Sequence, residues 1–399
     1  MKWLSIRFRF YGLNGLHWGS VALLSPLFVL VLMDRGLSLA QVGLWSGLNA
    51  FTVMSMEIPT GGLADLWGRG RVFALSQCVS ALGLASMAFL PGIMPIFAGA
   101  FFLGLGRALS SGSLEAWFVD ALKQEDSLTN LEKAVAGAES LSLGSLALGS
   151  FLGGLLPRWL GTGFFLPIVI SLVLKWITCV LTLLWVKDTP VHDSSLYAPK
   201  GTLKVGTLWE SIRNKEGQRL IPLMMSGALL ALGTGVSESF WQPRFVELGG
   251  NTFHMGILMA LCFGMGAFAS AWAPTVSNVL GGHERGVVAY QGLLVAGLLL
   301  MSMAQGTVPL AMGMLAVYGG AAGAGVPRRA LFHKRIPDAH RATMLSVDSL
   351  TSYAGFGGVA LLGFVAKNWG IPWVWGITSI LVLVWMYPGW AWSSHRRTE

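Results

Sequence analysis

Ionisable side chains inside long apolar stretches are the residues best suited to chemistry in this sequence. Glu57, Glu115 and Glu139 each lie roughly 10 Å from the inner end of a predicted helix, and Arg107 lies roughly 20 Å in, at a helix rise of about 1.5 Å per residue. Carboxylates held close together at low dielectric constant do not all ionise, so at least one is expected to hold a proton near neutral pH. Proton coupling requires this property.

Two cations suggest a second kind of chemistry. Arg107 carries a permanent charge and Lys175 lies near the middle of another apolar stretch, so either could bind an anionic group. Structural alternatives stay open for the acids: Glu115 and Glu139 could bridge helices or extend to water, and Glu57 could belong to a charged cluster at the helix end. We interpret His17, deep in the first apolar stretch, as a polar helix-packing residue.

The composition indicates that these stretches cross a membrane. Of 399 residues, 54% are hydrophobic and 12% are charged, about half the charged share of a soluble domain. A bilayer is spanned by roughly 20 apolar residues, and lipid-facing backbone must close its own hydrogen bonds, which favours helices. Cys78, Cys179 and Cys262 all lie in such stretches and are interpreted as buried small hydrophobic residues. Four of the runs without Asp, Glu, Lys or Arg are 10–33, 36–56, 72–106 and 286–327.

Proline, glycine and polar residues divide the chain into twelve predicted transmembrane helices. With both termini on the cytoplasmic side of a bacterial inner membrane, 21 Lys and Arg residues fall on inner segments and four on outer segments. The net charge of +8 then reflects topology and anionic membrane lipid, and requires no nucleic acid. The predicted spans are 11–33, 39–63, 72–91, 93–121, 131–157, 163–187, 217–248, 252–278, 285–305, 307–334, 341–367 and 371–393.

A long polar stretch divides six predicted helices from six. It gives an N-terminal bundle over 1–187, a cytoplasmic linker over 188–216 and a C-terminal bundle over 217–399. The linker is expected to contain a short amphipathic helix around 207–215. The halves match at an offset of 209 residues, at which Glu139 corresponds to Asp348 and Gly154 to Gly363. We favour duplication over a chance match because the acidic position also recurs.

The segment GGLADLWGRGR places charges and glycines between two apolar runs. It resembles the signature loop between helices two and three of the major facilitator superfamily, with Leu66 in place of the usual basic residue and Gly70 inserted. The pattern at Glu57–Gly61 and the Trp241-Gln242-Pro243 tripeptide resemble bacterial drug and metabolite exporters of the proton antiporter type, although Ser150 replaces the proline of their antiporter motif. The matching residues of the signature loop are Gly61, Leu63, Ala64, Asp65, Gly68, Arg69 and Arg71.

This resemblance implies a cytoplasmic latch between the two halves. Asp65 would bind amides at the start of helix eleven, and Arg69 would pair with Asp120 at the end of helix four. The alternative is an ordinary charged turn that follows from the asymmetry of basic residues. The expected latch comprises Gly61, Asp65, Gly68, Arg69, Arg71 and Asp120.

Gates and an apolar cavity are the remaining predicted features. Asp348 is expected to pair with Arg328 or Arg329 as a cytoplasmic gate, and Glu238 and Arg244 are expected to form an outer gate. The predicted cavity aromatics are Trp18, Trp45, Phe240 and Trp241.

The sequence therefore predicts an all-α membrane protein with twelve transmembrane helices in two pseudo-symmetric six-helix bundles. Its expected function is proton-coupled export of a small organic compound by alternating access, as a monomer in contact with membrane lipid. The alternatives are uptake of an organic anion or sugar, lipid flipping, and a transporter-like receptor. No nucleotide-binding loop, metal-ligand cluster or catalytic motif is present in the sequence, so no enzyme activity, cofactor or metal is expected and the proton gradient is the expected energy source.

Overall fold

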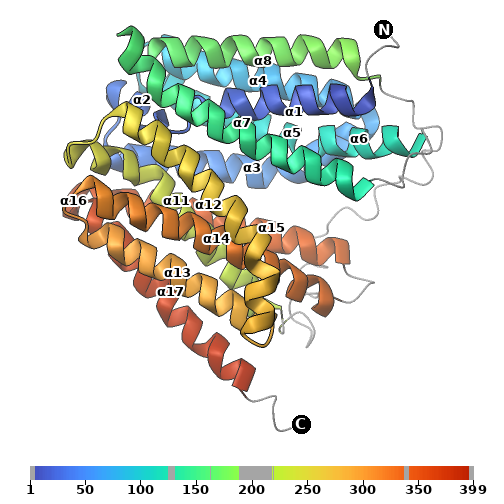
Figure 1. The fold of residues 1–399 in the computed structure, drawn as a ribbon. Coiled ribbons are helices and arrows are strands. Elements are labelled where there is room, and N and C mark those ends of the chain that lie inside the picture. Colours follow the sequence, from blue (N-terminus) through green and yellow to red (C-terminus); the bar gives the residue numbers. More distant parts are fainter. Residues whose placement is uncertain are drawn as a thin grey trace. The chain divides into compact units, whose positions relative to one another are not determined.

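The protein is almost entirely helical wherever its structure is described. The computed structural model describes residues 5–124, 131–161, 163–187, 218, 220–336 and 341–394. Within these ranges there are α-helices and no strand (Figure 1). Nine helical stretches in the described ranges are long and apolar enough to cross a membrane. The predicted all-helical, multi-span fold is present, and a total of twelve spans is compatible with it.

The helices follow the apolar stretches of the sequence in order. In the first part of the chain they are α1 (Ile6–Ala22), α2 (Phe28–Asp34), α3 (Leu39–Trp67), α4 (Arg69–Phe89), α5 (Ile93–Ser110), α6 (Ser113–Gln124), α7 (Leu131–Leu160) and α8 (Phe165–Trp185). In the second part they are α11 (Ile221–Glu247), α12 (Thr252–Val279), α13 (His283–Met303), α14 (Thr307–Arg335), α15 (Arg341–Gly357), α16 (Val359–Trp369) and α17 (Ile371–Ser394).

Three of the predicted continuous helices are instead divided. The span predicted at 11–33 consists of α1 and α2, which are separated by turns at residues 23–27. The span at 93–121 divides between α5 and α6, where Gly112 has φ +68°, a conformation that favours glycine. The span at 341–367 divides at Gly358, between α15 and α16. The helix predicted at 207–215 lies outside the described residues.

The signature segment is mostly helix rather than loop. Helix α3 continues to Trp67, beyond the predicted end at residue 63, so Gly61 to Asp65 lie on its last turns. The chain then reverses at Gly68, whose φ of +100° places it in the region that favours glycine, and α4 begins at the next residue. A single residue therefore forms the turn.

The described structure separates into two compact units. Unit 1 comprises Met1–Gly36, Phe51–Lys200 and Asn251–Ala260, and unit 2 comprises Leu37–Ala50, Gly201–Gly250 and Leu261–Glu399. The units therefore differ from the sequence halves 1–187 and 217–399 in two segments. The first residues of α3 pack with the second half, and the first residues of α12 pack with the first half.

Unit 1 is built around α1, α4 and α8, which run side by side in Figure 1. Helix α4 also packs against α5, and α1 packs against α7. An aromatic core fixes the ends of α1 and α6, where the rings of Phe10 and Phe118 stack with centroids 4.0 Å apart. Leu13, Phe73 and Leu122 complete this core, each with at most 2% of its surface exposed.

Unit 2 is built around α11, which packs against α14, α15 and α17. Helices α13 and α14 form a second close pair in this unit. Glycines allow that contact: a Cβ atom at Gly320 would lie 2.6 Å from the backbone nitrogen of Leu294. The backbones of α13 and α14 therefore approach more closely than any larger residue would permit.

Candidate functional site

Helix α8 has its polar residues inside and its apolar residues outside. Ser171, Lys175, Thr178 and Thr182 recur at helical spacing and are all at most 4% exposed. The opposite face of α8 exposes large apolar residues, as expected of a helix that faces lipid. The side chain of Lys175 is therefore directed into unit 1. The large exposed apolar residues of α8 are Phe165, Val173, Trp176, Ile177, Val180, Leu183 and Leu184.

An imidazole and an amide lie close together inside unit 1. His17 Nδ1 on α1 lies 3.0 Å from Nε2 and 3.3 Å from Oε1 of Gln77 on α4. Gln77 is 1% exposed and its Nε2 also donates to Ser76 Oγ at 3.1 Å. The imidazole contacts the edge of the Trp18 ring, at a centroid distance of 5.1 Å. These contacts fix the orientation of the His17 ring.

Two cations lie near this imidazole. The positive charges of Lys175 on α8 and Arg107 on α5 both act electrostatically on His17. Among the described residues, neither side chain has a hydrogen-bond or ion-pair partner. Lys175 is 4% exposed, whereas Arg107 is exposed. His17 and Gln77 thus lie in contact inside unit 1, and Lys175 and Arg107 are near enough to act on the imidazole; cations and N–H donors of this kind suit an anion.

The predicted acids lie on three different helices. Glu115 on α6 and Glu139 on α7 are exposed, and neither forms an ion pair within the described part of the chain. Glu57 is half-buried on α3. Glu139 differs from its repeat mate Asp348 because the residue that corresponds to Arg328 at the 209-residue offset is Val119. Unit 1 therefore lacks the arginine that neutralises this acidic position in unit 2.

One ion pair connects the signature segment to α6. Arg69, at the start of α4, pairs with Asp120. Arg71 is exposed, and the side chain of Asp65 lies outside the described atoms. A Cβ atom at Gly61 would meet nothing within 4 Å. The function of these residues as a latch stays a prediction.

A second and more buried ion pair lies in unit 2. Arg328 Nη1 on α14 donates to Asp348 Oδ1 on α15 at 2.7 Å, with 11% and 13% of the two side chains exposed. Arg328 also donates to the backbone oxygen of Leu223 at 3.3 Å. Arg329 is exposed and donates to Gly325 of its own helix. Of the two arginines expected near Asp348, the structure therefore pairs Arg328 with it.

The predicted outer gate residues do not pair with one another. Arg244 Nη1 donates to Glu247 Oε2 at 3.0 Å, three residues along α11, and its Nη2 donates to the backbone oxygen of Ala304. Glu238 instead accepts a hydrogen bond from the hydroxyl of Tyr318 on α14, at 3.2 Å. Residues six apart lie on different faces of a helix, so these two side chains point in different directions.

The predicted cavity aromatics are mostly buried. Trp45 is 6% exposed, and Phe240 and Trp241 are at most 1% exposed, all within unit 2. Trp18 is half-buried in unit 1, beside His17. Phe240 and Trp241 thus belong to the packed interior of unit 2 in this structure.

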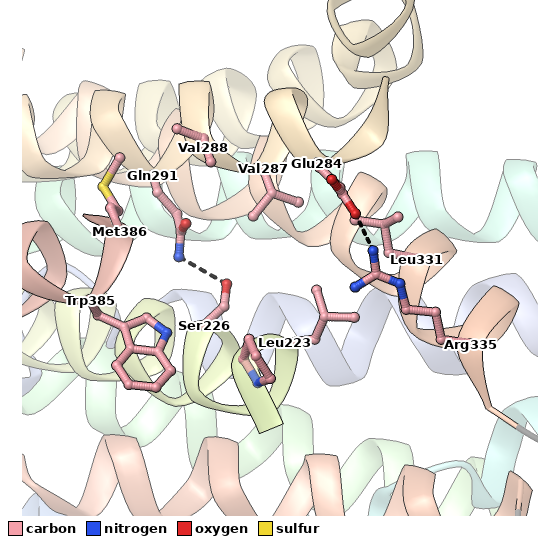
Figure 2. A pocket seen from close by; sticks show the side chains of 11 residues that line it. Leu223, Ser226, Glu284, Val287, Val288, Gln291, Leu331, Arg335, Trp385 and Met386 are labelled. Carbon is pink, nitrogen blue, oxygen red and sulfur yellow. Dashed lines mark hydrogen bonds and ion pairs between the residues drawn. The ribbon is translucent and has the colours of Figure 1, made fainter. Parts of the chain in front are cut away.

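A small pocket lies in unit 2 among α11, α13, α14 and α17 (Figure 2). Gln291 donates to Ser226 at 2.8 Å on one side of it, and Arg335 pairs with Glu284 on the other. Its volume of about 70 Å³ has room for about two water molecules. The pocket is therefore too small for an organic substrate.

Sequence reasoning missed Gln77, whose amide contacts His17, and Tyr318, whose hydroxyl donates to Glu238. Gln77 is the one amide in the uncharged run 72–106, and that isolation was a usable signal. Tyr318 had no such signal, because its partner Glu238 lies 80 residues away. Among the described residues there is no group of three or more His, Cys, Asp or Glu that could hold a metal ion.

Known proteins with similar sequences are transporters. The profile of the Major Facilitator Superfamily matches residues 10–357. The uncharacterized MFS-type transporter YxaM of Bacillus subtilis (strain 168) is 26% identical over 264 residues, which cover 65% of this chain and 62% of that protein. Lysophospholipid transporter LplT of Klebsiella pneumoniae (strain 342) is 26% identical over 281 residues, which cover 67% of this chain and 64% of that protein. The matched part is thus less than two thirds of each relative's length.

Solved structures show the same fold. A mutant form of nucleoside transporter NupG has a TM-score of 0.82 at 14% identity, covering 97% of this chain and 99% of that one. An auto-inhibited POT family peptide transporter has a TM-score of 0.79 at 12% identity, and the match covers 98% of this chain and 96% of that one. At these identities the likeness concerns the fold alone. Because the profile match extends over most of the chain, this multi-pass membrane protein belongs to the Major Facilitator Superfamily of secondary transporters.

Proposed function

We propose that the protein transports an organic anion, which binds to Arg107, Lys175 and His17 in unit 1. Lys175 is the observation that carries this proposal. Its side chain is 4% exposed and has no hydrogen-bond or ion-pair partner among the described residues. Burial of most of this side chain takes its ammonium group partly out of water, which costs free energy relative to full hydration. A bound anion would offset that cost, and an ionisable residue kept in a membrane span at such expense is a functional candidate.

We further propose that the anionic group is a phosphate and that the substrate class is the lysophospholipids. A guanidinium and an ammonium together match the several acceptor oxygens of a phosphate. Three relatives at 25% to 26% identity are named lysophospholipid transporters, and a lysophospholipid carries such a phosphate. Two cations at the site would repel a cationic drug, so the site favours this class over the cationic compounds that many exporters carry.

Proton coupling is the second part of the proposal. Glu115 and Glu139 are exposed carboxylates of unit 1 without an ion pair in the described residues, so a proton could bind and leave without breaking one. We propose them, with Glu57, as proton carriers that drive transport, and we expect net export under an inward proton gradient. Alternating access would supply the mechanism. The Arg69–Asp120 and Arg328–Asp348 pairs would stabilise one conformation, and Asp65, Gly61, Gly68 and Arg71 would act with the first pair.

Transport by purified protein in liposomes tests the substrate class. The probes are a fluorescent lysophosphatidic acid, glycerol 3-phosphate as the same charged group without an acyl chain, and ethidium as a cationic dye. We expect saturable transport of the lysophospholipid and little movement of ethidium. Rapid ethidium transport without lysophospholipid transport would contradict the proposal and favour drug export. Transport of glycerol 3-phosphate alone would keep the anion site but reject the lipid class.

Single substitutions test the site. A hydrogen bond to a charged group contributes about 1.5 to 3 kcal/mol, so Lys175→Met is expected to weaken lysophospholipid binding by about 10- to 150-fold. Lys187→Met is the matched control, because Lys187 follows the same helix and is exposed. An unchanged affinity in Lys175→Met would remove this residue from the site. Imposed pH gradients, with Glu115→Gln and Glu139→Gln, test the proposed proton carriers.

A further inference from the structure

An acidic group and a hydroxyl meet inside unit 2. Glu238 lies on α11, about 26 Å from its first residue at a rise of about 1.5 Å per residue. Its neighbours Ser237 and Ser239 are at most 4% exposed, whereas Glu238 is exposed. Ser237 donates to Gly233 of the same helix, and Ser239 shares a hydrogen bond with Ser46. The carboxylate of Glu238 therefore projects from a packed polar segment into accessible space.

The hydroxyl of Tyr318 is held in place beside this carboxylate. It donates to Glu238 Oε1 at 3.2 Å, and the Tyr318 ring meets the edge of Phe263 on α12 at 6.1 Å and 89°. A phenol that donates to a carboxylate stabilises its ionised form. When the carboxyl group binds a proton, its second oxygen can still accept from the phenol. The hydrogen bond from Tyr318 is therefore compatible with both protonation states of the carboxyl group.

Charged and titratable groups lie on the helices packed near Glu238. The charge of Glu238 acts on Tyr318 of α14 and on Cys262 of α12. On α11 itself, Arg244 binds Glu247. On the other helices that contact α11, Asp348 of α15 pairs with Arg328 and Glu284 of α13 pairs with Arg335. The same helices also carry other ionisable residues, and α17 carries none from Ile371 to Met386. These further residues include Tyr290 on α13, Arg329, His333 and Lys334 on α14, Tyr353 on α15 and exposed Lys367 on α16.

We infer that Glu238 is a proton-binding site of the transport cycle in unit 2, and that Tyr318 is its positioning residue. This inference rests on the proposed function in assuming a coupled transporter, but it assigns a proton to a residue outside the acids of unit 1. The chemistry is reversible protonation of one carboxylate, which needs no further reactant. Binding of a proton to Glu238 would neutralise one negative charge in unit 2. The transport cycle would then combine this change in unit 2 with anion binding in unit 1.

Infrared difference spectroscopy of the purified protein between acidic and basic buffer tests the site without any substrate. We expect a band of a protonated carboxyl group that disappears in Glu238→Gln and changes frequency in Tyr318→Phe, where one hydrogen bond is lost. Glu247→Gln is the matched control on the same helix and should keep the band unchanged. A band that Glu238→Gln leaves intact would overturn the inference, whatever substrate the protein carries.

Transport measured with fluorescent lysophosphatidic acid gives the second readout. In Glu238→Gln we expect loss of the acceleration of transport by a pH gradient. Tyr318→Phe should change the pH profile of transport, because the carboxylate loses a hydrogen-bond donor. Full acceleration in Glu238→Gln would overturn the coupling role. Failure of the wild-type protein to transport the probe would reject the proposed substrate class, and the infrared result would still decide the proton site.

Discussion

At the scale of single residues, the most informative side chain is Lys175. It lies on the interior face of α8 with Ser171 and Thr178, and its amine has no partner in the described part of the chain. A folded protein is stabilised by replacing such a group with an apolar residue of similar shape. A residue that lowers stability and is nevertheless present at an interior position suggests selection for binding rather than for folding.

We therefore predict that Lys175→Met raises stability while it lowers anion binding. The unfolding free energy is expected to rise by about 1 to 3 kcal/mol, because an uncompensated buried charge is removed. Thermal unfolding in detergent measures the first effect and calorimetric binding of lysophosphatidic acid measures the second. Thr178→Val on the same face removes a hydroxyl that bonds only to its own helix, and should leave binding within about twofold. A destabilised Lys175→Met protein would indicate an undetected anionic partner and contradict the prediction.

The two thiols of unit 1 allow a second residue-scale prediction. Cys78 on α4 and Cys179 on α8 are free thiols with sulfur atoms 3.2 Å apart. Copper–phenanthroline should accept two electrons from this pair to give one disulfide and two protons, since little movement separates the contact from a bond. Mass spectrometry should find a peptide linking Cys78 and Cys179, with Cys262 still alkylated. Because both helices belong to unit 1, the oxidised protein should keep at least half of its transport rate. If all three cysteines remain free thiols after oxidation, the contact between Cys78 and Cys179 is refuted.

The sequence was informative about which residue types enter the interior and less informative about their directions. Arg107 and Lys175 could be selected because charges within apolar runs are rare. Depth along a helix placed Glu57, Glu115 and Glu139 at one level, but depth does not fix the rotation of a helix about its axis. That rotation depends on packing with neighbours distant in sequence, and it decides that Lys175 faces His17 while Glu115 and Glu139 are exposed.

At the scale of helical elements, two ion pairs bind neighbouring helices with different expected strength. Arg328 and Asp348 join α14 to α15 with 11% and 13% of their side chains exposed, whereas Arg69 and Asp120 join α4 to α6 with 22% and 45% exposed. Solvent weakens the second pair, and exposed pairs contribute about 0 to 1 kcal/mol. Breaking a buried pair leaves one charge without a partner and costs about 3 to 5 kcal/mol.

We predict that Asp348→Asn lowers the unfolding free energy by about 2 to 4 kcal/mol, slightly less than for a fully buried pair. Asp120→Asn serves as the comparison and should cost about 1 kcal/mol or less. Chemical unfolding of both variants in the same detergent measures the difference. If Arg328→Met in the Asp348→Asn background restores much of the loss, the penalty belongs to the unpaired guanidinium. Equal losses for the two single variants would show that burial does not govern these pairs.

Helix positions were predictable, and helix breaks were less so. Apolar length and charge placed α4, α8 and α13 close to their observed bounds, because membrane-spanning backbone must satisfy its own hydrogen bonds. The break at Gly112 was missed because glycines are frequent in membrane helices and most of them continue the helix. The turn at Gly68 was expected to be a longer loop. At this end Ala64 of α3 and Val72 of α4 share a buried apolar cluster with Leu109 of α5, a contact that composition does not report.

At the scale of the whole molecule, two glycine contacts are related by the internal repeat. In unit 1, a Cβ atom at Gly154 on α7 would lie 2.4 Å from the oxygen of Thr252 and 2.6 Å from the Cα of Gly256 on α12. In unit 2, a Cβ atom at Gly43 on α3 would lie 2.8 Å from the Cα of Gly363 on α16. The offset of 209 residues that relates Gly154 to Gly363 also relates position 43 to position 252. The same close contact therefore occurs once in each unit.

These two contacts connect helices from opposite halves of the sequence at the N-terminal ends of α3 and α12. Each needs a backbone approach that only glycine permits, since real Cβ contacts below 3.0 Å essentially do not occur. In an alternating-access cycle, such contacts would have to form in one state and separate in the other. Their strength then helps to set the balance between the two states.

We predict that Gly154→Ala and Gly43→Ala shift the protein toward the state in which these contacts are open. Each added methyl group collides with backbone atoms, so the contact must widen. Spin labels placed at the N-terminal end of α3 and on α16 should report a longer distance in Gly43→Ala, and labels on α7 and α12 should do so in Gly154→Ala. Transport by each variant should fall several-fold, because one half of the cycle is disfavoured. The repeat predicts similar effects for the two variants.

Matched alanine variants separate this effect from the general effect of losing a glycine. Gly144 on α7 and Gly62 on α3 lie on the same two helices, and a Cβ atom at either would meet nothing within 4 Å. Gly144→Ala and Gly62→Ala should therefore keep wild-type distances and be neutral or slightly stabilising, because alanine favours the helix by about 1 kcal/mol. If Gly154→Ala resembles Gly144→Ala in both distance and transport, the contact has no part in the conformational balance. If only one of Gly154→Ala and Gly43→Ala has an effect, the two units share the repeat in sequence and packing, but the glycine contact of only one unit influences the conformational balance.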